Sequence, residues 1–439
     1  MTQGLRDHPL RDQLVHEVHA RPFASLTAPQ RASHLALLSG EAAAAEDRAQ
    51  VARLCETYGA PAPGPEDTHV MVDLGPFQLK WERHTEFSSY TFFQNAGTPG
   101  FDASAVPFAA PVIAQVPRDW LENLPGGLLV GVHLELEPKD APERDPDALA
   151  HLFETDNVAG SLVSGGAAAV WMDFAVHADG FGRILLHDRG LRPRQAGRLV
   201  QRLCEIETYR MLALLALPLA HQHGPKLGRS GERLIEITAR MAAIEGLEDE
   251  RRLLGDLTRM SAEIEDMAAT ASYRFGAARA YYALVRRRVE ELREERFEGM
   301  QTIGEFLERR LAPAVRTCEA VAVRLDAHSE RVSRASQLLR TRIDIALEAQ
   351  NSALLRSIDQ RARLQLRLQR TVEGLSVAAI SYYLVGLIGY AAKAGKAAGL
   401  KLDVDLITGL AIPVVVGLVG FGVWRLRRLV QHDARSDGT

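Results

Sequence analysis

The sequence is poor in cysteine and shows no disulfide or metal framework. Only Cys55, Cys204 and Cys318 occur in 439 residues, and no two of them form a Cys-x-x-Cys pair. Dispersed cysteines in odd number are typical of a reducing compartment and argue against a disulfide scaffold and a structural zinc site. We therefore expect the larger part of the chain to lie in the cytoplasm.

The sequence lacks three further features, and each absence argues against one kind of partner, targeting segment or binding site. The 52 basic residues are balanced by 56 acidic ones, so the composition predicts no nucleic-acid partner. Residues 1–14 contain no apolar run, so they predict neither a secretory signal nor an anchor. The glycine-rich segment 160–166 lacks the Gly-Lys-Ser/Thr ending of a phosphate-binding loop, which favours a loop or a strand kink. No motif identifies a reaction, and none identifies a cofactor.

Two uncharged stretches near the C-terminus are the strongest signal that is present. Residues 374–392 and 406–424 each run for 19 residues without a formal charge, and 13 residues separate them. A bilayer core about 30 Å thick needs roughly 20 residues of helix. The two stretches therefore predict a transmembrane hairpin over residues 373–430, followed by a tail at 431–439. The alternative is a helical hairpin buried in a soluble domain.

Arginines flank this hairpin on both sides and predict its orientation. The basic residues nearest the two outer ends are Arg356, Arg361, Arg363, Arg367, Arg370, Arg425, Arg427 and Arg428. The loop between the spans has three lysines and two aspartates. By the positive-inside rule both flanks, and with them both termini, are expected to be cytoplasmic.

Residues 1–225 combine strand and helix patterns. Strands are expected at 34–38, 69–74, 77–93 and 127–137, and 168–187 is expected to form a hairpin that turns at Asp179-Gly180. Helices are expected at about 9–21, 41–58 and 193–217. The pattern predicts an α+β domain with a mixed or antiparallel sheet.

Residues 226–372 are rich in Arg, Glu, Leu and Ala and predict a helical, coiled stalk. An apolar stripe with a mean period of about 3.7 residues runs from Val321 to Ile358. The stripe needs a partner, which is either segment 247–297 folded back within the chain or the same helix of another subunit. Because no glycine or proline interrupts residues 314–373, the stalk is expected to continue into the first span.

Two groups of polar residues are candidates for a site. His16 and His19, three residues apart beside Arg21, lie on one helical face and are able to bind a divalent metal, although no third ligand is evident. Arg83, His84 and Glu86 lie on the strand expected at 77–93, where two carboxylates flanking His84 would raise its pKa and prepare it for proton transfer. A solvated sheet face is the simpler interpretation of the second group.

The predicted spans contain small residues on regular faces. Gly386 and Gly389 in the first span, and Gly409, Pro413 and Gly417 in the second, allow helices to approach closely within the hairpin or between subunits. Neither span contains an ionisable Asp, Glu, Lys, Arg or His, which weighs against a proton relay inside the bilayer.

Several motifs together resemble a bacterial family of uncharacterised membrane-anchored proteins. They are His16-Glu17-Val18-His19-Ala20-Arg21-Pro22-Phe23, residues 81–93, Asp188-Arg189-Gly190-Leu191 with residues 193–199, and Glu373-Gly374-Leu375-Ser376. The resemblance covers about residues 8–429 and implies a bacterial inner membrane, but no reaction. In layout alone the chain is also similar to CorA-type magnesium transporters, although their Gly-Met-Asn signature is replaced by Gly389-Tyr390-Ala391.

Three functions follow as hypotheses. The first is a non-enzymatic protein of the lipid bilayer whose cytoplasmic domain and stalk bind a protein partner or form a homo-oligomer. The second is a CorA-like oligomeric ion channel or transporter. The third is a membrane-tethered enzyme that uses His16, His19, Arg83, His84 or Glu86.

Overall fold

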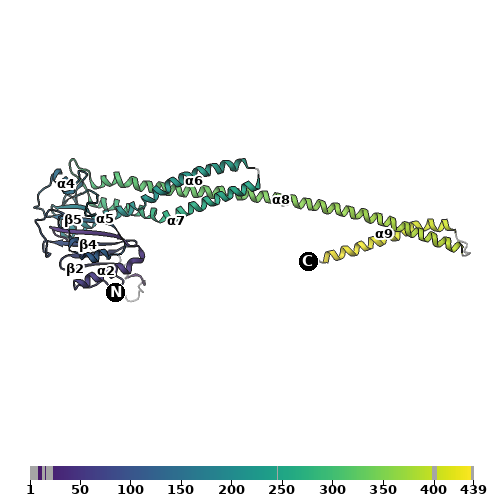
Figure 1. Ribbon diagram of the computed structural model, residues 1–439, viewed down its shortest axis with the longest axis horizontal. Helices are drawn as coiled ribbons and strands as arrows, with labels where there is room; N and C mark the ends of the chain where they lie inside the picture. The colour runs from purple at the N-terminus through teal and green to yellow at the C-terminus, as the bar shows by residue number, and fades with distance from the viewer. Residues whose placement is uncertain (1–7, 12–14, 16–22, 245, 398–402, 437–439) are drawn as a thin grey trace, which may run out of the picture. The chain divides into compact units, whose positions relative to one another are not determined.

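The computed structural model describes residues 8–11, 15, 23–244, 246–397 and 403–436 (Figure 1). The chain divides into two compact units. The first comprises residues 1–244 and 252–336, and the second comprises residues 245–251 and 337–439. The sheet lies in the first unit, and the apolar C-terminal helices lie in the second.

A nine-stranded mixed sheet forms the centre of the first unit. Its order is β2-β3-β4-β1-β5-β8-β7-β6-β9, and among the described strands only β5 and β8 pair in parallel. The mixed sheet expected from the sequence is therefore confirmed. The strands are β1 (Gln30–Leu38), β2 (His69–Asp73), β3 (Gln78–Arg83), β4 (Ser88–Asn95), β5 (Gly127–Glu137), β6 (Ala159–Val163), β7 (Ala168–Met172), β8 (Gly182–Asp188) and β9 (Glu295–Arg296).

The single strand expected at 77–93 is wrong. The segment forms two antiparallel strands, β3 and β4, in which Trp81 lies opposite Tyr90. The chain reverses between them, where the His84 N–H donates to the Phe87 carbonyl at 2.9 Å. Because this turn contains none of the Gly, Pro or Asn residues that usually mark hairpins, the alternating pattern concealed it.

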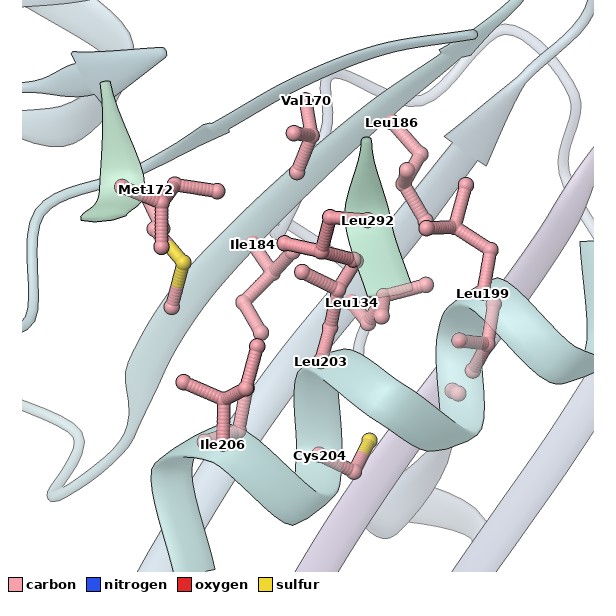
Figure 2. Close-up of a cluster of buried hydrophobic side chains, with 14 of the residues drawn as sticks. Leu134, Val170, Met172, Ile184, Leu186, Leu199, Leu203, Cys204, Ile206 and Leu292 are labelled. Carbon is pink, nitrogen blue, oxygen red and sulfur yellow. The ribbon is translucent and has the colours of Figure 1, made fainter. Parts of the chain in front are cut away.

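Helix α5 (Pro193–Leu214) covers one face of the sheet. Pro193 stands in its first turn, where a missing N–H costs nothing, and the Gln195 side chain accepts the Arg192 N–H. Its apolar residues at positions 196, 199, 200, 203 and 206 lie on one side and pack on β5, β7 and β8, as Figure 2 shows for Leu199 and Leu203 against Leu134 and Ile184. This packing holds α5 against the sheet.

Shorter elements cover the opposite face. Helix α2 (Ala44–Thr57), preceded by the 3-10 turn η1 (Glu41–Ala43), packs on β1 to β4 together with η2 (Val112–Gln115) and α3 (Arg118–Glu122). Helix α4 (Pro146–Phe153) packs on β7 and β8. Asp145 caps α4 by accepting the Ala148 N–H at 2.7 Å. Both faces of the central strands are therefore buried, whereas the edge strands β2 and β9 keep exposed residues.

Three long helices follow, and the stripe of the stalk finds a partner within the chain. In the first unit, α8 (Ile303–Ala397) lies beside α6 (Leu217–Ala243) and α7 (Leu247–Leu292), with His328 hydrogen-bonded to Ser230 of α6 at 2.8 Å. Val321, Leu325 and Val332 are buried there. The connection from α7 to α8 includes β9, which adds an edge strand to β6 and was not expected.

In the second unit, α8 continues without interruption to Ala397, as the sequence predicted. Leu339 and Ile343 are buried, and Arg342 pairs with Glu250 at 2.9 Å. Helix α9 (Val404–Ser436) follows. Each of the two helices contains a window long and apolar enough to cross a membrane, of which only 11% and 6% is buried. These windows are therefore unlike the buried hairpin of a soluble core.

Candidate functional site

A small polar cavity lies between α5 and the sheet. It has a volume of about 40 Å³, enough for ordered water. Strands β1, β3 and β4 line one side of the cavity and α5 lines the other, and Ala24, which precedes β1 in the sequence, also lines it. Its lining residues are Ala24, His34, Lys80, Glu82, Phe87, Ser89, Thr91, Phe93, Gly197, Val200, Gln201, Cys204, Glu205, Thr208 and Tyr209.

His34 lies at the centre of a hydrogen-bonded chain in this cavity. Its Nδ1 lies 2.8 Å from Thr91 Oγ1, and its Nε2 lies 3.1 Å from Thr208 Oγ1. The Thr208 hydroxyl donates to the Cys204 carbonyl at 2.9 Å, so its oxygen accepts from Nε2–H, and Thr91 donates to Nδ1. Burial, and then the charge of Lys80, lowers the pKa of His34 to about 3. The imidazole is therefore neutral with both nitrogens engaged.

Lys80 begins a second polar chain that crosses from the sheet to α7. Its Nζ lies 3.1 Å from Glu82 and donates to Gln201 at 2.9 Å. Gln201 donates to Glu205 at 2.8 Å, and Glu205 pairs with Arg288 of α7. Each charged side chain in this hydrogen-bonded series has a partner of opposite charge, as buried charges require: Lys80 pairs with Glu82, and Glu205 pairs with Arg288.

Among the described residues that line the cavity, Cys204 carries the only thiol. Burial, and then the charge of Glu205, raises the pKa of Cys204 to about 12, so the thiol stays protonated and is a poor nucleophile. With His34 engaged on both sides and Lys80 neutralised, the described cavity residues include no activated nucleophile and no free base. The arrangement is suited to holding water or a small polar group.

Arg83, His84 and Glu86 do not form a common site. Arg83 points to the face opposite the cavity and pairs with the buried Asp47 at 3.0 Å. His84 stacks on Phe87 in the turn, with ring centroids 4.2 Å apart. Glu86 accepts hydrogen bonds from Tyr281 at 2.6 Å and from Arg274 at 2.8 Å, both on α7. The predicted strand alternation therefore ends at Arg83, and these residues hold the turn in place.

The metal candidates His16 and His19, with Arg21, lie outside the described residues. Within the part of the chain that is described, no three His, Cys, Asp or Glu side chains are grouped to hold a metal ion. The metal pair stays a prediction.

A serine, a histidine and an aspartate come together on the other face of the sheet. Ser33 Oγ lies 3.0 Å from His133 Nδ1, and His133 Nε2 lies 3.7 Å from Asp179 Oδ2. Ser33 is fully buried and its oxygen accepts the Ile113 N–H at 3.2 Å. Burial lowers the pKa of His133 to about 4, although Asp179 opposes this shift. Because no substrate reaches Ser33 and the aspartate lies beyond hydrogen-bond distance, this arrangement is not a catalytic triad.

The glycines of the two apolar helices differ in their surroundings. A β-carbon at Gly389 would lie 3.5 Å from Thr408 of α9, whereas at Gly386, Gly409 and Gly417 it would meet nothing within 4 Å. Pro413 lies inside α9. Gly386, Gly409 and Gly417 therefore leave room for a neighbouring helix. The packing role of all five residues stays a prediction.

The sequence interpretation missed the cavity residues His34, Lys80 and Cys204. Lys80 and Glu82 alternate with Leu79 and Trp81 on β3, a pattern that is typical of a strand with one solvated face. The sequence contained only a weak signal for the cavity. Strand β3 has a polar face, and the segment that forms α5 carries the polar residues Gln201, Glu205 and Thr208.

The fold and the site define a class: a mixed-sheet unit with a small cavity between the sheet and α5, followed by long helices and two apolar helices long enough to span a membrane. The chain belongs to the family described as "Protein of unknown function (DUF3422)", whose model matches residues 6–430. The expected family resemblance is thereby confirmed. No curated protein matches the chain. The similarity of layout to CorA-type transporters stays a prediction.

Proposed function

We propose that the protein is a membrane-anchored module that self-associates through α8 and presents its sheet unit to a partner. One observation carries this proposal: α8 stays rich in leucine after residue 350, where the described residues leave these side chains exposed. Leu354, Ile358, Leu368 and Val372 are 55%, 60%, 67% and 62% exposed. Such a patch is typical of an interaction surface.

This segment of α8 is amphipathic. At about 100° per residue, Leu354, Ile358, Leu364, Leu368 and Val372 fall within an arc of roughly 120°, which also contains Ser357, Arg361 and Gln365. Arg356, Arg363, Arg367 and Arg370 fall within about 60° on the other side. A helix with separate apolar and basic faces buries the first and solvates the second. A second copy of α8 supplies a matching apolar face, from which the long side chain of Arg361 has to extend its guanidinium to the solvent at the edge.

The anchor follows from the two apolar helices. We infer that 374–392 and 406–424 cross the inner membrane of a bacterium, with both termini on the cytoplasmic side where the flanking arginines lie. The cavity supports a non-enzymatic role, because its described residues hold one another in neutral or paired states.

Size measurement of the full-length protein in lipid nanodiscs and in mild detergent tests the proposal. We expect an oligomer, and we expect Leu354→Gln with Ile358→Gln to shift it towards monomer. Val323→Gln with Leu338→Gln is the matched control, since these residues are 67% and 60% exposed on α8 but lie before the segment. A strictly monomeric protein without a co-purifying partner would contradict the proposal.

A further inference from the structure

A second polar hollow lies in the first unit, apart from the cavity beneath α5. It is an open cleft of about 500 Å³ between the first turns of α5, the end of α7 and the turn that joins β6 to β7. Four arginines line it, with one amide and one hydroxyl: Arg198, Arg202, Arg287, Arg293, Gln195 and Ser164. The wall is almost wholly polar, unlike a pocket for an apolar ligand.

The acidic residues at this cleft do not neutralise its arginines. Glu291 is shared by Arg202 at 3.1 Å, Arg287 at 3.3 Å and Arg288 at 2.9 Å. Burial alone would raise the pKa of Glu291, but these guanidinium groups lower it. Glu291 thus contacts three guanidinium groups and is ionised, and one of the three, Arg288, is also paired with Glu205.

Two guanidinium groups have no carboxylate partner among the described residues. Arg198 stacks over the Phe23 ring at 5.6 Å, and Arg293 is exposed just after the end of α7. Glu290 is exposed and lies 3.9 Å from Arg286, one turn earlier on α7. The cleft therefore has a surplus of positive charge at Arg198 and Arg293.

Hydrogen-bond donors also exceed acceptors in the cleft. The oxygen of the Gln195 side chain already accepts the Arg192 N–H at 3.0 Å, which leaves its amide NH₂ to donate. Gln195 stands in the first turn of α5, a 22-residue helix whose N-terminus favours negative charge. Planar guanidinium groups fit the paired oxygens of a phosphate better than any other side chain does.

We propose that this cleft binds a phosphate group, held by Arg198 and Arg293 with Gln195 and Arg202 beside them. The phosphate belongs either to a soluble ester or to a lipid headgroup, because both present the same oxygens. This binding goes beyond the proposed self-association and does not depend on it.

Calorimetric titration of the full-length protein with sodium pyrophosphate, in micelles of a maltoside detergent that carries no phosphate, tests the site. We expect saturable binding that weakens as salt rises. Arg198→Gln with Arg293→Gln should weaken it about 100-fold, and Arg198→Lys with Arg293→Lys should weaken it less, because lysine keeps the charge but loses the paired geometry. Equal melting temperatures would show that the variants fold.

Arg316→Gln is the matched control, because Arg316 is an exposed arginine that lies 3.5 Å from Glu308 on α8, outside the cleft. It should bind pyrophosphate as the parent does. A titration in nanodiscs that contain phosphatidylglycerol distinguishes a lipid headgroup from a soluble ester. A weaker affinity for pyrophosphate in these nanodiscs indicates that the lipid headgroup competes for the cleft, and an unchanged affinity for pyrophosphate indicates a soluble ester. Absence of binding at millimolar pyrophosphate, or unchanged affinity in the double glutamine variant, would overturn the proposal.

Discussion

The guanidinium of Arg83 lies 3.0 Å from the carboxylate of Asp47, and both side chains are buried. Asp47 also accepts hydrogen bonds from Ser88 at 2.7 Å and from Tyr90 at 3.2 Å. Burial and the Asp47 charge raise the pKa of Tyr90, which keeps its hydroxyl a donor. The network joins α2 to the hairpin of β3 and β4.

We predict that Asp47→Asn destabilises the protein by about 3–5 kcal/mol, because it leaves the Arg83 charge buried without a counter-ion. Chemical denaturation of the purified protein measures the loss. Glu122→Gln provides the comparison, since it breaks an exposed pair with Arg118 on α3 and should change stability little. Equal effects of the two substitutions would show that the buried pair of Asp47 and Arg83 contributes no more to stability than the exposed pair of Arg118 and Glu122.

Gly197 supports a second prediction. A β-carbon there would lie 1.7 Å from the Ala24 carbonyl oxygen, so any side chain forces the segment over the cavity to move. Gly197→Ala should therefore lower stability by about 1–3 kcal/mol in spite of the better helix propensity of alanine.

Gly228→Ala on α6 is the matched test, because nothing lies within 4 Å of that position. It should raise stability by up to about 1 kcal/mol. Denaturation midpoints of the two variants, compared with the parent, give the signs. A stabilised Gly197→Ala protein would mean that the Ala24 segment does not pack on α5.

Secondary structure was predictable from the sequence where a local pattern of residues determines it without help from distant parts of the chain. Strand β5 spans the residues expected, the β7–β8 hairpin turns at Gly180 with a positive φ of 86°, and α8 continues through a stretch without glycine or proline. Strand β9 was not predictable, because its two residues depend on the return of the chain past β6.

The cavity was hidden for a related reason. Lys80 lies on an alternating strand and is buried only because α5 covers it, 121 residues later in the chain. A single-sequence pattern distinguishes polar from apolar faces, but it does not show which polar face is covered. The expectation that Arg83, His84 and Glu86 lie on one strand failed for another reason, because residues 84–87 form a turn that contains none of the usual turn residues.

The buried histidine His34 should make the folded protein less stable as the pH falls. Its pKa is lowered to about 3 in the folded state, whereas an unfolded histidine titrates near 6.5. The folded state therefore binds fewer protons, and the stability it gains above pH 6.5 is lost as pH falls towards 3. Between pH 7.5 and pH 5 the expected loss is about 2 kcal/mol.

His34→Gln should remove this part of the pH dependence while keeping a polar group between Thr91 and Thr208. Denaturation at pH 7.5 and pH 5 measures the difference. His133, with a pKa lowered to about 4, adds acid sensitivity of the same sign, so the variant keeps part of the slope. An unchanged slope in His34→Gln would show that the pKa of His34 is the same in the folded and unfolded states, so that burial does not lower it.

Glu135 on β5 should act in the opposite direction. Burial raises its pKa to about 7, although Arg31, whose Nε lies 3.3 Å away, opposes the shift. An unfolded glutamate titrates near 4.3, so the folded state holds the proton over a range where the unfolded state does not. The stability this contributes is present at low pH and is lost as pH rises from about 4.3 to about 7.

Glu135→Gln keeps an oxygen for the Phe108 N–H, which Glu135 accepts at 3.2 Å, and removes the titration. We therefore expect the stability of the variant, relative to the parent, to rise with pH between 5 and 7. Denaturation across that range checks the sign, and Glu122→Gln on the exposed α3 pair serves as the control with no such trend. A relative stability that stays flat over this range would mean that the Arg31 charge outweighs burial and keeps Glu135 ionised.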